Sequence, residues 1–170
     1  YTSLAGGPYS VKVTGVNNTT GIALAEIYDA SGLAFTTSTP RLVNVSARAQ
    51  VGTGDCLLIA GFVIEGSTSC RVLIRGVGPT LASYGVSGTL ADPQVELSRT
   101  VNNLPTVVTS NDNWGNDSSI AAAASAVGAF ALTASSGKDA AILVTLQPGV
   151  YSAKVSGVGG TTGVALVEVY

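Results

Sequence analysis

The sequence predicts an all-β protein, an antiparallel β-sandwich of jelly-roll type with one short helix near residues 118–127. Short runs in which apolar and polar residues alternate recur along the 170 residues, and turns rich in Gly, Ser, Thr and Pro separate them. The composition is 46% hydrophobic but only 6% aromatic and 11% charged, which suits half-buried strands. Only one stretch predicts a helix, which argues against an α/β enzyme fold.

One segment of the chain occurs twice. Residues 150–170, VYSAKVSGVGGTTGVALVEVY, match residues 8–28, PYSVKVTGVNNTTGIALAEIY, at 13 of 21 positions without a gap. Each segment alternates on both sides of a turn, which predicts a β-hairpin. A single domain seldom needs the same hairpin twice, whereas a repeating array always does. The duplication therefore indicates a repeat with a period of 142 residues.

Three parts of the chain follow from this duplication. Residues 41–170 form the β-sandwich, which its own C-terminal hairpin completes. Residues 1–28 are the duplicated hairpin, expected to belong to a neighbouring unit or to be donated to one. Residues 29–40 form a linker, in which Leu33 and Phe35 leave two interpretations open. The linker packs lightly on its own domain, or it docks on a neighbour as an extended segment.

The predicted elements of the sandwich follow one another at short intervals. Residues 41–51 alternate, and residues 56–64 are apolar on both faces, which predicts a central strand covered on both sides. A short turn leads to residues 70–77, so these two strands are expected to pair as a hairpin. The helix begins after an N-cap, Asp117 or Ser118. The remaining strands are expected at 94–97 paired with 107–109, and then at 129–132 and 140–146, before the C-terminal hairpin.

Charge and residue types exclude several classes of function. The net charge is −2 and the eight Lys and Arg residues are scattered, which argues against nucleic acid and anionic membranes as partners. No apolar run approaches the roughly 20 residues of a membrane span. The chain has no His, so imidazole bases, His metal ligands and Ser-His-Asp triads are excluded. We therefore expect no enzyme, no cofactor and no metal site.

The polar segment 110–117 has two interpretations. Asp112 and Asp117, with their neighbouring asparagines, offer oxygen ligands to a hard cation such as Ca²⁺. Alternatively these side chains bond their own backbone and cap the helix, which we favour. Trp114, the sole tryptophan, is expected to pack over the end of the sandwich rather than to stack on a sugar.

Two resemblances to known families are visible. The segments ADPQVEL (91–97), SNDNWG (110–115) and LQPGVYSAKVSG (146–157) resemble the pre-peptidase C-terminal domain, a secreted jelly-roll sandwich appended to bacterial enzymes and adhesins. The run from RLVNVS (41–46) through VLIRGVGPTLASYGV (72–86) to GTTGVALVEVY resembles an uncharacterised repeat of very large extracellular proteins of environmental bacteria. In that repeat, VEVYD of one copy runs into RLVN of the next. Neither resemblance implies catalysis. The calcium site of some pre-peptidase relatives is not carried over, because the carboxylates here are too sparse.

Two cysteines in a chain expected to be extracellular make a disulfide the first hypothesis. Cys56 and Cys70 begin consecutive antiparallel strands, so we expect them at opposite ends of that hairpin, roughly 30 Å apart at the rise of a strand. A disulfide joins Cα atoms no more than about 7 Å apart. Two outcomes stay open: Cys70 of one unit bonds Cys56 of the next, or both thiols are free.

Together these inferences predict a non-enzymatic structural protein of the bacterial exterior. It would be a subunit or repeat unit of a filament or surface fibre, with itself as partner, assembled head to tail by exchange of strands or hairpins. An adhesion or carbohydrate-binding module of a large secreted protein, with a glycan as partner, is the alternative. The residues expected to make the assembly contact are Tyr9, Val11, Val13, Ile22, Leu24, Leu33 and Phe35.

Overall fold

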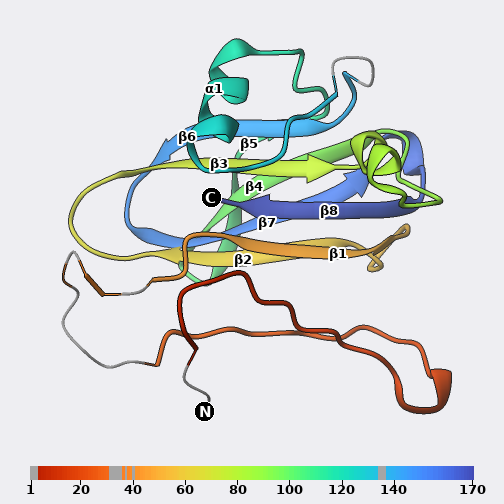
Figure 1. Ribbon diagram of the computed structural model, residues 1–170, viewed down its shortest axis with the longest axis horizontal. Helices are drawn as coiled ribbons and strands as arrows, with labels where there is room; N and C mark the ends of the chain where they lie inside the picture. The colour runs from red at the N-terminus through yellow and green to blue at the C-terminus, as the bar shows by residue number, and fades with distance from the viewer. Residues whose placement is uncertain (1–3, 31–35, 37, 40, 134–136) are drawn as a thin grey trace. The chain divides into compact units, whose positions relative to one another are not determined.

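The computed structural model describes residues 4–30, 36, 38–39, 41–133 and 137–170. The chain divides into two compact units, Tyr1–Val43 and Asn44–Tyr170 (Figure 1). Each unit is described by itself, and the larger, C-terminal one holds all the strands among the described residues.

The C-terminal unit is a β-sandwich of two four-stranded antiparallel sheets, which confirms the predicted fold class (Figure 1). Its strands are β1 (Val45–Val51), β2 (Leu58–Ile64), β3 (Cys70–Val77), β4 (Pro93–Val101), β5 (Leu104–Asn111), β6 (Ala140–Leu146), β7 (Gly149–Gly157) and β8 (Gly163–Val169). The first sheet has the order β1-β8-β3-β6, and the second has the order β2-β7-β4-β5. The predicted pairing of 94–97 with 107–109 is confirmed, with Leu97 opposite Thr109.

The chain changes sheets at nearly every connection. Among the described strands, only β4 and β5 are neighbours both in sequence and in one sheet. Each of the others pairs with strands that are distant in sequence, so the two sheets are held together by connections as well as by packing.

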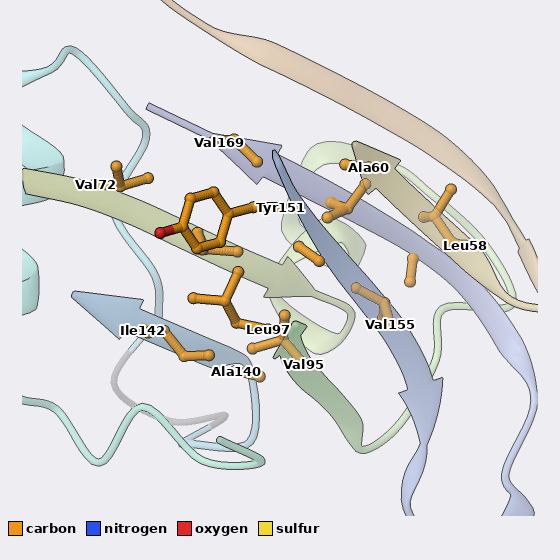
Figure 2. Packing of buried hydrophobic residues seen from close by; sticks show 14 of the residues in the cluster. Leu58, Ala60, Val72, Val95, Leu97, Ala140, Ile142, Tyr151, Val155 and Val169 are labelled. Carbon is orange, nitrogen blue, oxygen red and sulfur yellow. The ribbon is translucent and has the colours of Figure 1, made fainter. Parts of the chain in front are cut away.

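The core lies between the sheets and takes every second side chain from β7 and β8. Figure 2 shows Tyr151, Leu97 and Val155 of the second sheet close to Ile142 and Val72 of the first. Full burial of one such apolar side chain stabilises the folded state by about 1.5–3 kcal/mol. The alternation of buried and outward residues therefore fixes which face of each strand turns inward.

Helix α1 (Ser118–Ala126) confirms the predicted helix. Its N-cap is Asp117, whose carboxylate accepts a hydrogen bond from the backbone N–H of Ser119 at 2.7 Å. Hydrogen bonding from the Ser119 side chain, followed by this backbone bond, holds the pKa of Asp117 below its usual value. Within the described part of the chain, no helix is long and apolar enough to cross a membrane.

The helix covers the outer face of the first sheet (Figure 1). Trp114 is only 8% exposed there and packs with Ile120 of the helix and Leu73 of β3. Its backbone N–H donates to the carbonyl of Asp139 at 2.8 Å. Trp114 therefore packs within the fold, as expected, but between the helix and the outer face of the first sheet and not over the end of the sandwich.

The C-terminal copy of the duplicated segment is not the hairpin that its alternation predicts. β7 lies between β2 and β4 in the second sheet, whereas β8 lies between β1 and β3 in the first. The turn between β7 and β8 thus crosses from one sheet to the other. Alternation shows that a strand has one buried face, but it does not show which strand pairs with it. The prediction of a strand pair was therefore wrong, although both strands exist.

Three further expectations are corrected. β2 and β3 lie in opposite sheets and do not pair, contrary to the predicted hairpin. β2 is an edge strand whose outward Ile59 and Val63 are 58% and 59% exposed, so it is not the covered central strand that its apolar run predicts. When no polar residues alternate with the apolar ones, the sequence does not indicate which face of the strand is covered. Residues 129–132 form no strand.

Candidate assembly segment

The predicted assembly residues belong mainly to the duplicated segment, which occurs in two environments. We call residues 8–28 the N-terminal copy and residues 150–170 the C-terminal copy. A residue of the first corresponds to the residue 142 positions further along. Leu33 and Phe35, also predicted to make the contact, lie outside the described residues.

Both copies contain the same turn. Val16–Asn18 and Val158–Gly160 are short 3-10 segments interrupted by a central residue with left-handed backbone angles. The central φ is 55° at Asn17 and 63° at Gly159. Glycine adopts this region freely, and asparagine is among the few other residues that adopt it readily. The Asn-for-Gly difference between the copies therefore preserves the turn.

Two identical residues of each copy maintain that turn. A Cβ on Gly157 would overlap the backbone carbonyl oxygen of Thr161, and a Cβ on Gly15 would overlap that of Thr19. The Thr19 hydroxyl donates to the carbonyl three residues earlier at 2.9 Å, and the Thr161 hydroxyl does the same at 3.0 Å. The turn is thus specified locally in both copies.

The C-terminal copy is enclosed by the sandwich. Tyr151 lies opposite Phe62 of β2 and Arg99 of β4, and its ring stacks on Phe62 with centroids 5.5 Å apart. Its hydroxyl donates to the carbonyl of Gln147 at 2.8 Å. Each strand of this copy has hydrogen-bonded partners on both edges.

The N-terminal copy has the same local contacts and none of that enclosure. Tyr9 donates to the carbonyl of Ala5 at 2.9 Å, as its counterpart does. No strand is assigned in residues 8–28, and outside the 3-10 segment the one backbone–backbone hydrogen bond of this copy among described residues closes the turn, from Thr19 N–H to the Val16 carbonyl at 3.2 Å. The predicted contact residues Tyr9, Val11, Val13, Ile22 and Leu24 are 59%, 75%, 58%, 82% and 80% exposed, whereas Tyr151, Ala153 and Val155 are at most 3% exposed.

The sandwich shows which residues of the segment face a core. The counterparts of Tyr9, Val11 and Val13 point into the core of the sandwich. The counterparts of Ile22 and Leu24 lie instead on the half-buried outer face of β8. The prediction missed the inward residues of the second arm, which correspond to Ala165, Val167 and Val169 of β8 and are Ala23, Ala25 and Ile27.

A buried ion pair fixes the end of the C-terminal copy. Arg75 of β3 is fully buried and bonds the Glu168 carboxylate through two nitrogens, Nε at 2.8 Å and Nη2. Its Nη1 donates to the Phe130 carbonyl at 2.6 Å, and its guanidinium lies 4.3 Å from the centre of the Phe130 ring. Because Nε, Nη1 and Nη2 of Arg75 each donate a hydrogen bond, the buried positive charge of the guanidinium is compensated.

Tyr170 belongs to the same cluster. Its hydroxyl donates to Glu168 Oε1 at 2.9 Å. Burial, followed by the nearby Glu168 charge, raises the pKa of Tyr170 to about 12. The glutamate and the tyrosine of this cluster are identical in both copies of the segment.

The N-terminal copy carries half of this cluster. Tyr28 donates to Glu26 Oε1 at 2.9 Å, which matches the distance in the C-terminal copy. That bond raises the pKa of Tyr28. No ion pair of Glu26 occurs among the described residues. The copy thus presents a carboxylate in the same local arrangement, without an arginine.

Six side chains of the C-terminal copy face the core, and their counterparts in the N-terminal copy have nearly the same total volume. Tyr, Val and Ala are unchanged at three inward positions. Relative to the C-terminal copy, the N-terminal copy has two more methyl groups at one inward position, two fewer at another and one more methylene at a third. Such volume-conserving exchanges are the kind that cores tolerate best. The three differences are Val11 for Ala153, Ala25 for Val167 and Ile27 for Val169.

The predicted cysteine pair is not joined within the sandwich. Cys56 and Cys70 are exposed free thiols. Cys56 precedes β2, whose first residue lies opposite Val155, whereas Cys70 lies opposite Leu146 at the other end of the sandwich. The expected separation to opposite ends is therefore present, but it arises from strands in different sheets and not from a hairpin.

The polar segment 110–117 bonds its own surroundings. The Asn111 side chain donates to the Asn113 carbonyl at 2.9 Å and accepts from Ala141 N–H at 2.9 Å. Asp117 caps the helix. Among the described residues no three acidic or cysteine side chains gather as they would around a metal ion. The contacts support the turn-and-cap interpretation of this loop.

Comparison with known proteins finds solved structures that are similar only at low sequence identity. No protein-family model matches the sequence, and none of the curated proteins matches it. One similar structure is the pre-peptidase C-terminal domain of a collagenase from Bacillus anthracis, with a TM-score of 0.44 and 12% identity over 75% of this chain and 89% of that chain. Another is a protein from Sulfurospirillum deleyianum, with a TM-score of 0.39 and 9% identity over 78% of this chain and 98% of that chain. Neither assigns the chain to a family.

Proposed function

We propose that this protein is a structural subunit or repeat unit of an extracellular bacterial filament or surface fibre, joined head to tail by exchange of the duplicated segment. One observation carries the proposal. The N-terminal copy has the turn, the inward side chains and the Glu–Tyr pair of two sandwich strands, yet no described strand pairs with it. Backbone groups without strand partners are a template for pairing with another chain.

The charge distribution supports contacts made by apolar burial and backbone pairing. Only 11% of the residues are charged. Of the ion pairs among described residues, Arg75–Glu168 is buried, and Lys138–Asp92 and Lys154–Glu96 lie at the surface. Surface pairs contribute little to stability. Assembly is therefore expected to persist in molar salt, because screening weakens only interactions between charges.

The cysteines supply a further link in this proposal. Cys56 and Cys70 are exposed near opposite ends of the sandwich, where stacked units would meet. Cys70 of one unit bonds Cys56 of the next. Non-reducing electrophoresis of assembled protein should show a ladder that collapses with reductant. A single monomer band without reductant would remove the disulfide from the proposal and leave strand exchange in place.

Negative-stain microscopy tests the function directly. The purified full chain should form filaments, and the chain without residues 1–30 should remain a folded monomer, because the sandwich of Asn44–Tyr170 already contains both its sheets. Dispersed full-length monomers would contradict the proposal. Unfolding of the truncated chain would show instead that the N-terminal copy stabilises its own sandwich.

A further inference from the structure

The sandwich identifies the acceptor for the N-terminal copy, an inference that rests on the proposed function. We infer that residues 8–28 of one chain occupy, in a second copy of this chain, the place that β7 and β8 hold, with Glu26 paired to Arg75 of that second copy. Three independent features of the structure support this acceptor: the register of the strands, the buried arginine and the volume of the core.

The register gives the inserted copy a defined set of neighbours. Lys154 of β7 lies opposite Glu96 of β4, and their side chains form an ion pair at 2.6 Å. Lys12 is the corresponding lysine of the N-terminal copy. In the second copy, Lys12 therefore lies opposite Glu96 and restores the same pair. Because the turn geometry is shared, both arms enter their two sheets together.

The buried arginine requires a carboxylate. Arg75 has no exposure, and a buried guanidinium left without its partner is strongly unfavourable. Any segment that replaces β8 must bring an acid to the position of Glu168. The N-terminal copy brings Glu26 to that position, already hydrogen-bonded to Tyr28 as Glu168 is to Tyr170.

The core accepts the copy with little change of volume, as the compensating exchanges above show. Each sandwich has one site for a segment of this kind, the site that β7 and β8 fill. Each chain carries two segments that fit this site, the N-terminal copy and the C-terminal copy. Exchange with a second copy therefore leaves the number of filled places unchanged. No strand pairing is lost overall, and the released C-terminal copy remains available to another chain.

Site-directed disulfides in mixed populations test this acceptor. One population carries Lys12→Cys and another carries Glu96→Cys, each with Cys56→Ser and Cys70→Ser. The two are mixed, unfolded, refolded together and oxidised. The expected result is a disulfide that joins a peptide containing residue 12 to a peptide containing residue 96, identified by mass spectrometry after digestion, which distinguishes the mixed dimer from homodimers of either population. Replacing Glu96→Cys by Gln50→Cys, on β1 of the other sheet, is the matched control and should give no disulfide that joins residues 12 and 50.

Three results decide the inference. A single chain with Lys154→Cys and Glu96→Cys shows that the paired positions form a disulfide when they meet. With that established, absence of the mixed dimer overturns the acceptor, even if filaments still form and the proposed function stands. Adding Glu26→Gln to the Lys12→Cys chain should reduce the yield of the mixed dimer. A chain carrying both Lys12→Cys and Glu96→Cys that closes only within itself would also overturn the inference.

Discussion

The two copies of one segment differ in their surroundings far more than in their sequence. They share 13 of 21 residues, the left-handed turn residue, the turn-closing hydroxyl and the Glu–Tyr hydrogen bond. One supplies a central strand to each sheet, and the other has no assigned strand. Local sequence thus determines the turn, whereas the strands need partners that are distant in sequence.

The largest difference between the copies is expected at the glutamate. Glu168→Gln leaves Arg75 buried without a charged partner and should lower the free energy of unfolding by about 3–5 kcal/mol. The matched change Glu26→Gln should shift the dispersed chain by less than about 0.5 kcal/mol, because its carboxylate is at the surface. Urea unfolding of both variants measures the contrast. Equal losses would show that Glu26 is already enclosed in the monomer.

The turn glycines give the next largest contrast. Gly157→Ala places a Cβ against the Thr161 carbonyl and should destabilise the sandwich by about 1–3 kcal/mol. Gly15→Ala places the same strain in the N-terminal copy, where it should leave the unfolding of the sandwich unchanged and reduce assembly. Unfolding curves and sedimentation separate the two effects. Normal assembly of the Gly15→Ala chain would contradict a role for this turn in joining units.

Transferring core residues between the copies tests their equivalence more finely. Ala153→Val adds volume to a closed core and should cost about 1–3 kcal/mol. The double variant Ala153→Val, Val167→Ala carries two inward residues of the N-terminal copy. It should be less destabilised than the sum of the single variants by about 1 kcal/mol. A double-mutant cycle in urea measures this coupling, and strict additivity would show that the two positions do not compensate.

The smallest contrast concerns the two tyrosines at high pH. The pKa of Tyr170 is about 12 in the folded chain and about 10 in an unfolded one. Between these values the folded chain retains a proton that the unfolded chain has lost, so stability is full below pH 10 and falls as pH rises toward 12. Tyr170→Phe should flatten this fall. Tyr28→Phe should not, because Tyr28 lies outside the Asn44–Tyr170 unit.

The sequence predicted the sandwich, the β4–β5 pairing and the capped helix because each depends on local patterns. Alternation revealed the inward face of β7, and Asp117 marked the start of α1. The pairing of β7 with β2 and β4 was not predictable in this way, because partners are chosen across the whole chain. The Arg75–Glu168 pair was missed for the same reason: 93 residues separate its members. Comparing the two copies shows that this glutamate is identical in both, but so are a lysine, a serine and two threonines, so the comparison does not single it out.

Backbone amide hydrogen exchange tests the central claim most directly: the N-terminal copy is an equivalent of β7 and β8 that enters a sandwich only on assembly. In the dispersed chain, residues 150–170 should be strongly protected and residues 8–28 should exchange rapidly. In the assembled protein, residues 8–28 should gain protection comparable with that of a central strand, and residues 150–170, which the accepting sandwich releases, should lose protection to the same extent. Protection of residues 8–28 already in the dispersed chain, or its continued absence after assembly, would contradict the account.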